Sequence, residues 1–447
     1  MLVHQFYDTF LAHASYAIVS EGQMAVVDPA RDPQPYYDFA ALHGAKIVAV
    51  FETHPHADFV SSHAEIAQTT GATIYVSQLL GADYPHQPFD EGASLQMGAV
   101  TFRALNTPGH SPDSITIQLF DASGTLHAVF TGDTLFVGDV GRPDLREKAG
   151  NITAKREELA RAMYHSTRNK LMTLPHETLV YPAHGAGSLC GKALSEERYS
   201  TIGKELRENY ALQPMDETTF VGLLLEDQPH IPKYFVHDVG LNKAGAPPLK
   251  TALERIPRLA ADAPLDPAAL VVDARPEKVY KAGHAPRALN IQYGGKFETW
   301  LGTVIGPEEK FYLITEDEAQ REELIRRIAN IGYEANLLGA LAGYSGPMVQ
   351  SNSLEVETLL AQPEAYTVVD IRNATEVRSG RVFAHSLHIP LAELRERMDE
   401  IPLDKPIVVH CAAGYRSAAG CSILRARLPQ ATVYDLSDRV TELMPST

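Results

Sequence analysis

The chain has 447 residues, more than one ordinary hydrophobic core holds, so we expect about three domains. Its 45% apolar and 21% charged residues are typical of a soluble globular protein. The formal charge of −17 argues against nucleic acid and anionic membranes as partners, because it repels phosphate at long range, but it does not exclude a small anionic substrate in a local basic pocket.

Membrane and secretory signals are not found in the sequence. No apolar run approaches the roughly 18 residues that a membrane span needs. The segment Met1–Asp8 lacks a basic region followed by an apolar stretch, so we expect a cytoplasmic protein. There the three cysteines, Cys190, Cys411 and Cys421, should be reduced, and an odd number does not suit a disulfide framework.

Over roughly the first 240 residues, short β-branched apolar runs alternate with glycine-rich turns and charged, helix-like stretches. The runs predict buried strands at 25–29, 46–51, 115–120, 128–130 and 179–181. This order predicts an α/β domain whose chemistry lies in the loops that follow the strands. Residues 246–262 belong to a stretch rich in proline, glycine and alanine, which predicts a linker with one short helix around Leu249–Arg255.

An internal repeat follows the linker. Val271–Glu277 matches Val368–Glu376, with two extra residues before the glutamate in the second copy, and the aspartates of the two copies are 97 residues apart. Each copy begins with a strand-like run. The repeat therefore predicts two further α/β units with parallel sheets, at 263–350 and 351–447.

Four strand-to-loop corners of the first domain carry residue types that bind metals. They are Thr53–Asp58, Thr107–His110, Thr131–Asp133 and Tyr181–His184. His54 and His56 sit two apart after a strand, so both can point to one side of the loop, and a Pro–Gly turn presents His110. A single loop histidine is ordinarily a surface or hydrogen-bonded residue, whereas four such corners in one segment favour a metal site.

Position 59 departs from a known pattern. The string from Thr53 begins like the two-metal motif of metallo-β-lactamase-fold hydrolases, but Phe59 stands where a further histidine ligand is expected. Together with Gly141–Asp144, the four corners resemble the metallo-β-lactamase superfold over residues 1–245, and more narrowly its persulfide dioxygenase (ethylmalonic-encephalopathy-protein-like) branch. The resemblance implies an αββα sandwich, and Phe59 counts against glyoxalase II and lactamase activities.

The resemblance also implies a ligand set. In the persulfide dioxygenase branch one iron is held by residues that correspond to His54, His110 and Asp133. The neighbouring His56, Asp58 and His184 would then orient ligands and bound water through hydrogen bonds. Two histidines and a carboxylate with open positions suit one Fe(II) and dioxygen better than a zinc pair and water. The alternative is that His56 is a third histidine ligand of a zinc site.

Three residues are candidates for binding the substrate. Arg142 can hold the carboxylate of a thiol carrier such as glutathione bidentately, or it can form a structural network with Asp144. Cys190 lies in a loop of small residues that resembles a Gly-Ser-x-Cys-Gly string of fused family members, and Lys192 could lower the pKa of its thiol. The alternative for Cys190 is a packed cysteine without chemistry.

The last domain contains a cysteine loop. Val408 and Val409 predict a strand that ends at Cys411, small residues follow, and a helix is predicted to begin near Ser417. Backbone N–H groups and the positive helix end can stabilise a thiolate or persulfide. Arg416 adds a charge that can face the sulfur of an anionic substrate.

This loop resembles the active-site loop of rhodanese domains, which implies that Cys411 carries sulfane sulfur as a persulfide. The loop residues are Ala412, Ala413, Gly414, Tyr415 and Ser417, with Arg416 between the last two. A phosphatase loop has five residues between cysteine and arginine, whereas only four lie between Cys411 and Arg416. We expect Cys421 to be a packing residue. The tail after Tyr434 lacks the paired glycines that are usual at rhodanese ends.

In the first repeat, Thr315-Glu316-Asp317 stands where the cysteine should be, so residues 263–350 are predicted to be a rhodanese-like domain without sulfur chemistry.

The leading hypothesis for the whole chain is an Fe(II) persulfide dioxygenase joined to a sulfurtransferase. Its expected partners are a glutathione- or coenzyme A-type persulfide, O2, thiosulfate or sulfite, and further copies of the chain in a homo-oligomer. The alternatives are a zinc thioester hydrolase with an accessory sulfur carrier, and a non-enzymatic persulfide carrier.

Overall fold

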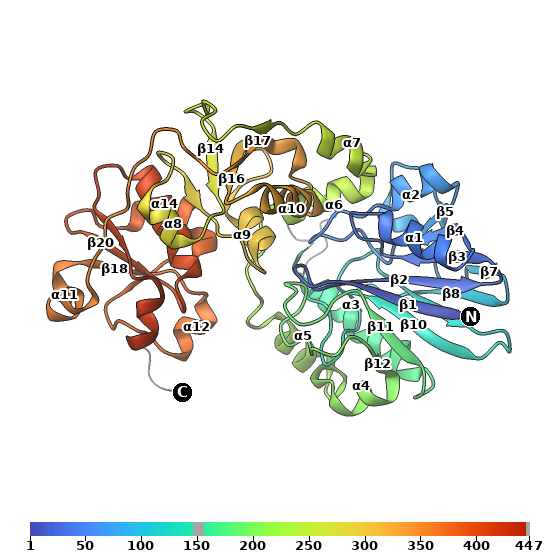
Figure 1. Ribbon diagram of the computed structural model, residues 1–447. Helices are drawn as coiled ribbons and strands as arrows, with labels where there is room; N and C mark the ends of the chain where they lie inside the picture. Colours follow the sequence, from blue (N-terminus) through green and yellow to red (C-terminus); the bar gives the residue numbers. More distant parts are fainter. Residues whose placement is uncertain (146–155, 444–447) are drawn as a thin grey trace. The chain divides into compact units, whose positions relative to one another are not determined.

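The computed structural model describes residues 1–145 and 156–443 (Figure 1). The chain forms two compact units, one of residues 1–252 with 329–332 and one of residues 253–328 with 333–447. The predicted domain limits at 245, 262 and 350 stay predictions, and residues 444–447 of the last domain lie outside the described part. None of the described helices combines the length and the hydropathy that crossing a bilayer requires.

The first unit contains two six-stranded sheets. One has the order β1-β2-β3-β4-β5-β6, and the other has the order β12-β11-β10-β9-β8-β7. The first sheet consists of β1 (Leu2–Asp8), β2 (His13–Ser20), β3 (Gln23–Val27), β4 (Lys46–Phe51), β5 (Thr73–Val76) and β6 (Gln87–Pro88). The second consists of β7 (Ser94–Met97), β8 (Val100–Asn106), β9 (Ile115–Phe120), β10 (Leu126–Gly132), β11 (Leu179–Pro182) and β12 (Ser200–Thr201).

Helices cover the outer face of each sheet. Buried side chains of α1 (Gln34–Leu42) and α2 (His63–Thr70) pack on the first sheet. Those of α3 (Arg156–Asn169), α4 (Ile202–Glu208) and α5 (Glu217–Leu225) pack on the second. A third core fills the space between the sheets, which confirms the predicted αββα sandwich. The unit continues with α6 (Tyr234–Ala244) and α7 (Leu249–Glu254).

Strand direction explains why the corners can meet. All five strands predicted in this unit are found, as β3, β4, β9, β10 and β11. Strand β9 is antiparallel to both β8 and β10, while β10 and β11 run parallel, so β8, β10 and β11 all point the same way. The loops that follow these three strands therefore leave the second sheet at one edge. The backbone bond from Ile115 N to Thr53 O, at 2.9 Å, attaches the loop after β4 to the second sheet.

The second unit contains two parallel sheets with one topology. The first has β15-β14-β16-β17 with β13 beyond β17, and the second has β19-β18-β20-β21. Its first half consists of β13 (Arg258–Leu259), β14 (Leu270–Asp273), α8 (Glu277–Ala282), β15 (Leu289–Asn290), α9 (Phe297–Val304), β16 (Phe311–Thr315), α10 (Glu318–Asn330) and β17 (Leu337–Ala342). Its second half consists of α11 (Val356–Ala361), β18 (Thr367–Asp370), α12 (Ala374–Ser379), β19 (Leu387–His388), α13 (Leu394–Arg397), β20 (Ile407–His410), α14 (Tyr415–Arg427) and β21 (Val433–Asp435).

The repeated Asp-x-Arg motif has the same role in both halves. Arg275 donates from Nε and Nη2 to Asp273 at 2.9 and 2.6 Å, and also bonds to the carbonyl of Gly283 just past α8. Arg372 likewise binds Asp370 and the carbonyl of Gly380 just past α12. Each arginine thus joins the end of a central strand to the end of the next helix, and its carboxylate partner compensates its buried charge.

We predict that Gly132→Ala destabilises the first unit by about 2–5 kcal/mol, because Gly132 has a φ of +51° and an added Cβ would collide with Thr53 Oγ1. Urea unfolding measures the change. Gly124→Ala is the matched control: its φ is +81°, but nothing lies within 4 Å of the added Cβ, so only the backbone cost of about 1–2 kcal/mol is expected. Equal losses in the two variants would contradict the close approach at Gly132.

Candidate metal site and cysteine loop

The four corners predicted from the sequence converge in the first unit. The loop after β4 carries His54 and His56, and the residues after β8, β10 and β11 include His110, Asp133 and His184. All five side chains are buried. The parallel direction of the three strands in the second sheet, and the attachment of the first loop to it, bring these residues together.

His54, His110 and Asp133 have the geometry of a metal site. Asp133 Oδ2 lies 3.7 Å from His54 Nε2 and 3.5 Å from His110 Nε2. Donor atoms that share one ion at bond lengths of about 2.0–2.2 Å lie roughly 3.0–3.5 Å apart. His110 Nδ1 bonds to the carbonyl of Arg142 at 2.9 Å, which leaves its Nε2 lone pair directed at the site.

Asp133 provides the test of whether these residues fit a cation. Its Oδ2 is buried and has no hydrogen-bond partner within residues 1–145 and 156–443. Burial alone raises the pKa of Asp133, but His184 and His110 outweigh it and hold the pKa well below its usual range. A buried, ionised carboxylate oxygen that faces two imidazole nitrogens is costly unless an ion binds it. The residues present therefore fit a bound metal ion.

His184 joins the two carboxylates of the site. Its Nδ1 lies 2.8 Å from Asp133 Oδ1, and its Nε2 lies 2.9 Å from Asp58 Oδ2. Burial alone lowers the pKa of His184, but Asp133 and Asp58 raise it well above its usual value. In this arrangement the ring fixes one oxygen of Asp133 and leaves the other directed at His54 and His110.

The position of His56 is compatible with both roles that the sequence leaves open, a hydrogen-bonding partner of the ligands and a third histidine ligand. Its Nε2 is 3.3 Å from Asp28 Oδ1, which suits a ring held outside the coordination shell. Burial lowers the pKa of His56, and the carboxylate of Asp28 more than compensates, so the pKa is raised. Ligand atoms of His56, Asp133 and His184 also lie within 4.8 Å of one another, so the ring is close enough to take part in a second donor group.

Phe59 lies beside the rings of His56 and His184. It is almost fully buried, and its ring centroid lies 4.5 Å from that of His56 and 6.4 Å from that of His184. Asn242 Nδ2 donates to the carbonyls of His56 and Phe59, each at 2.8 Å, and so holds this turn. The phenyl ring puts carbon where dinuclear relatives are expected to have a nitrogen ligand.

His13 was not found by sequence reasoning. Its ring packs against Phe59, with centroids 3.8 Å apart, and its backbone forms an isolated bridge with His184. Burial, with His184 and His56 nearby, lowers the pKa of His13 well below its usual value, so a neutral ring lines the site. A single histidine at the start of an apolar strand has no spacing pattern that distinguishes it from a core residue.

Arg142 forms the structural network rather than an open carboxylate clamp. Its Nε and Nη2 each donate to Asp144 at 2.7 Å, and its Nη1 donates to the carbonyl of Leu189 at 3.1 Å. The side chain is buried. Its backbone N–H also bonds to the carbonyl of Cys190. Of the two predicted roles, the structure therefore shows the pairing with Asp144. The bonds from Arg142 to the carbonyls of Leu189 and Cys190, and the bond from His110 Nδ1 to the carbonyl of Arg142, join the loop of Cys190 to the loop of His110.

The expectation that Lys192 lowers the pKa of Cys190 is wrong. Lys192 Nζ donates to the carbonyls of Leu223 and Glu226 at 2.7 and 3.2 Å. Burial raises the pKa of Cys190 well above its usual value, and the nearby carboxylates of Asp58 and Asp133 raise it further. Cys190 still has its sulfur within 4.8 Å of donor atoms of Asp58 and His184, so a neutral thiol faces the site.

The cysteine loop of the second unit surrounds a buried sulfur. Strand β20 ends at His410, and helix α14 begins at Tyr415, two residues before the predicted start. Gly414 donates its N–H to Cys411 Sγ at 3.1 Å. Gly414 has a φ of +96°, and an added Cβ would lie 2.8 Å from Asp438 N, so only glycine fits this turn. The loop therefore directs a backbone donor at the sulfur, as predicted.

Arg416 does not carry an uncompensated charge. Its Nη1 and Nη2 donate to Glu376 of α12 at 2.6 and 2.7 Å. Burial lowers the pKa of Arg416, and Glu376 more than restores it, so the pKa is raised. Glu376 thus binds the guanidinium and fixes the orientation of Arg416 beside the loop, and the predicted role of its positive charge towards an anionic substrate stays a prediction.

Strand pairing identifies the residue that replaces the cysteine in the first repeat. Asp370 pairs with His410, and the equivalent Asp273 pairs with Ile314, so Thr315 occupies the position of Cys411. The Thr315 hydroxyl donates to the carbonyl of Leu341 at 3.0 Å. A hydroxyl that donates to a backbone carbonyl is a poor nucleophile.

The first repeat contacts the cysteine loop of the second. The Tyr415 hydroxyl donates to the carbonyl of Gln292 at 2.7 Å, and Ser422 Oγ accepts a bond from Asn290 N at 2.9 Å.

Ser437 takes a left-handed conformation, with a φ of +55°, in the tail that lacks the usual glycines. Its N–H bonds to Asp435 at 2.9 Å, which offsets part of the backbone cost.

Comparison with known proteins identifies the family of two of the domains. The family model of the metallo-beta-lactamase superfamily matches residues 8–184, and that of the rhodanese-like domain matches residues 354–438. The crystal structure of a metallo-beta-lactamase from Staphylococcus aureus subsp. aureus COL superimposes with a TM-score of 0.69 at 32% identity and covers 76% of this chain and 99% of that chain. The chain belongs to the metallo-β-lactamase superfamily. It combines that domain with a C-terminal rhodanese-like domain.

The curated relatives include enzymes of different activities. The mitochondrial persulfide dioxygenase ETHE1 of Mus musculus is 31% identical over 156 residues, which are 35% of this chain and 56% of the relative. The cytoplasmic hydroxyacylglutathione hydrolase of Arabidopsis thaliana is 34% identical over 174 residues, which are 38% of this chain and 62% of the relative. The chain thus spans between one half and two thirds of the length of these relatives.

We predict that the wild-type chain binds one equivalent of metal and that Phe59→His binds up to two, because the substitution adds an imidazole beside Asp58 and His184. Elemental analysis after loading with Zn(II) and desalting measures the stoichiometry. Phe59→Leu keeps an apolar side chain there and should stay at one equivalent. Two equivalents in the wild-type chain would contradict the role given to Phe59.

Proposed function

We propose that the chain is an Fe(II)-dependent persulfide dioxygenase joined to a thiosulfate sulfurtransferase. The observation that carries the proposal is a buried set of two histidines and one aspartate, with Phe59 at the position where the motif of dinuclear hydrolases has a further histidine. Such a ligand set with open positions suits Fe(II) and dioxygen. Similarity to a persulfide dioxygenase and the presence of a rhodanese-like domain support the same chemistry, since both act on sulfane sulfur.

The residues of the first site would bind the ion, hold its aspartate ligand in place and limit access of water. His54, His110 and Asp133 would bind one Fe(II), which supplies open positions for a thiol persulfide and the redox chemistry with O2. His184 would hold Asp133 in place and keep a proton beside it. The rings of Phe59 and Phe136 next to His184 would limit water.

The second site would transfer sulfur. The Cys411 thiolate attacks the outer sulfur of thiosulfate, the S–S bond breaks, and sulfite leaves with the bonding pair while Cys411 keeps the sulfur as a persulfide. The Gly414 N–H would stabilise the negative sulfur, and Arg416, held by Glu376, would attract the anionic substrate. The reverse reaction would use the sulfite that the first site makes and return thiosulfate.

A zinc thioester hydrolase is the second candidate. The 34% identity to a hydroxyacylglutathione hydrolase favours it, as does the position of His56 near Asp133 and His184. Phe59 counts against it, because a dinuclear hydrolase needs a donor on the side that the phenyl ring fills. The alternative therefore predicts activity with zinc and no use of oxygen.

We predict that the chain, loaded anaerobically with Fe(II), consumes O2 when glutathione persulfide is added and releases sulfite. An oxygen electrode and sulfite derivatisation measure the two. Asp133→Asn should lower the rate at least about 100-fold, since it removes a charged donor from the ion. No oxygen uptake with iron, together with thioester hydrolysis with zinc, would exclude the dioxygenase.

We predict that Cys411→Ser abolishes transfer of sulfur from thiosulfate to cyanide while most of the oxygen uptake remains, because the two sites lie in different units. Cys421→Ala is the control: burial raises the pKa of the Cys421 thiol to about 12, so it carries no thiolate at neutral pH, and the variant should keep transfer. Loss of both activities in Cys411→Ser would contradict two independent sites.

A further inference from the structure

The tail of the second repeat packs directly against the cysteine loop. A Cβ added to Gly414 would lie 2.8 Å from Asp438 N and 3.0 Å from the carbonyl carbon of Ser437. Gly414 is also the residue whose N–H donates to Cys411 Sγ at 3.1 Å. Because the two backbones are in such close contact, the conformation at Ser437 affects where this N–H points.

Ser437 has a strained backbone. Its φ of +55° lies in the left-handed region, which costs free energy for a residue with a Cβ. Such a conformation persists only where the surrounding contacts hold it. Within its own repeat, Ser437 donates its N–H to Asp435 Oδ1 at 2.9 Å. The close contacts of its hydroxyl, by contrast, come from the first repeat.

Two charged residues of α8, in the first repeat, bind this hydroxyl. Ser437 Oγ donates to Glu277 Oε1 and accepts a bond from Lys281 Nζ at 2.6 Å. Lys281 Nζ also pairs with Glu277 and lies 3.0 Å from Oδ2 of Asp435, whose side chain is almost fully buried. Charges that are shielded from water hold one another more firmly than exposed ion pairs do. Helix α8 therefore fixes Ser437 from across the boundary between the repeats.

The same part of the first repeat binds the other side of Gly414. Tyr415, the next residue in the chain, donates its hydroxyl to the carbonyl of Gln292 at 2.7 Å. The side chain of Gln292 accepts a bond from Glu277 N at 2.9 Å. One connected group of the first repeat thus holds Gly414 through its neighbour in sequence and through its neighbour in space.

Glu277 has a counterpart in the second repeat. It ends the repeated motif Val271–Glu277, and the second copy of this motif ends with Glu376. Glu376 accepts two bonds from Arg416, which follows the loop. The glutamates of both copies therefore bind beside the same cysteine loop, one from within its repeat and the other from the neighbouring repeat.

We propose that Glu277 and Lys281 are positioning residues for the Cys411 site. They hold Ser437 against Gly414 and so keep the Gly414 N–H directed at the sulfur that takes up and releases sulfane sulfur. The first repeat, which has Thr315 in place of the cysteine, thereby contributes to sulfur transfer without chemistry of its own. This inference rests on the proposed sulfur transfer at Cys411.

Steady-state transfer of sulfur from thiosulfate to cyanide by the full chain tests the proposal. Glu277→Ala should lower kcat about 10-fold, because Ser437 then leaves its left-handed conformation in most molecules. The KM for thiosulfate should change less than about twofold, since Arg416 keeps its pair with Glu376. Lys281→Met should have the same effects on kcat and KM.

A Ser437→Gly background tests whether the effect passes through Ser437. Glycine adopts a positive φ without strain and needs no contact to hold it there. In this background Glu277→Ala should therefore lower kcat by less than about twofold relative to Ser437→Gly alone. A 10-fold loss in both backgrounds would show that Glu277 acts through general packing and would overturn the proposal.

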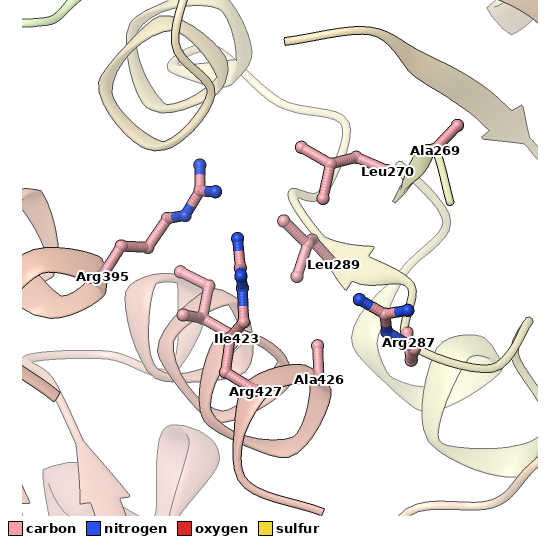
Figure 2. Close-up of a pocket in the computed structure, with 8 residues that line it drawn as sticks. All are labelled: Ala269, Leu270, Arg287, Leu289, Arg395, Ile423, Ala426 and Arg427. Carbon is pink, nitrogen blue, oxygen red and sulfur yellow. The ribbon is translucent and has the colours of Figure 1, made fainter. Parts of the chain in front are cut away.

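Another part of the boundary between the repeats supplies the matched control. Figure 2 shows Arg395 of α13 there, together with Leu289 of the first repeat and Ile423 of the second. Arg395 donates from Nη1 and Nη2 to Glu309 at 2.7 Å each, so this ion pair joins the same two repeats at a different place. Glu309→Ala should leave kcat unchanged. A loss equal to that in Glu277→Ala would overturn the proposal.

Deuterium exchange on peptides that cover residues 412–416 separates this inference from the proposed function. The Gly414 amide should exchange about 10-fold faster in Glu277→Ala, because its bond to the sulfur opens more often, and at the wild-type rate in Glu309→Ala. Faster exchange in a chain that transfers no sulfur would support the positioning and refute only the proposed function. Unchanged exchange in Glu277→Ala would overturn the positioning itself.

Discussion

The first site depends on the contacts of the Asp133 carboxylate, whose two oxygens face different histidines. One oxygen is held by His184 at 2.8 Å, and the other lies 3.5 and 3.7 Å from the imidazoles of His110 and His54. Burial in a low-dielectric sandwich makes each of these contacts stronger and makes an unfilled one more costly. Two sheets and four loops must therefore meet correctly at this residue, and Gly132 and Gly141 on either side of it leave no room for a Cβ.

Phe59 is the residue on which the proposal of a single-ion site rests. A histidine at this position would add a donor beside Asp58 and His184 and complete a second ion site. The phenyl ring instead packs on His13 and His56 and makes that side of the site apolar. On this proposal, the residue at position 59 affects the coordination chemistry while the αββα sandwich that supports the site stays the same.

The two halves of the second unit share a framework and differ at the position of the cysteine. Both copies retain the aspartate–arginine pair that joins strand to helix, since it compensates a buried charge in each. The residue after the third strand differs: Thr315 bonds to the backbone where Cys411 accepts an N–H from Gly414. The first copy is still in contact with the second, because the Tyr415 hydroxyl bonds to the carbonyl of Gln292.

Local patterns in the sequence determined the strands, the repeat, the four metal-binding corners and the cysteine loop, because each depends on neighbours in the chain: apolar runs, turn residues and short spacings. Tertiary structure decided which partners these residues meet. In the folded chain, Arg142 pairs with Asp144, and Lys192 donates to two carbonyls. Arg416 pairs with Glu376, and His13 packs beside Phe59. Three of these four contacts join residues far apart in the chain, and whether a charge is compensated or buried depends on packing that no local pattern contains.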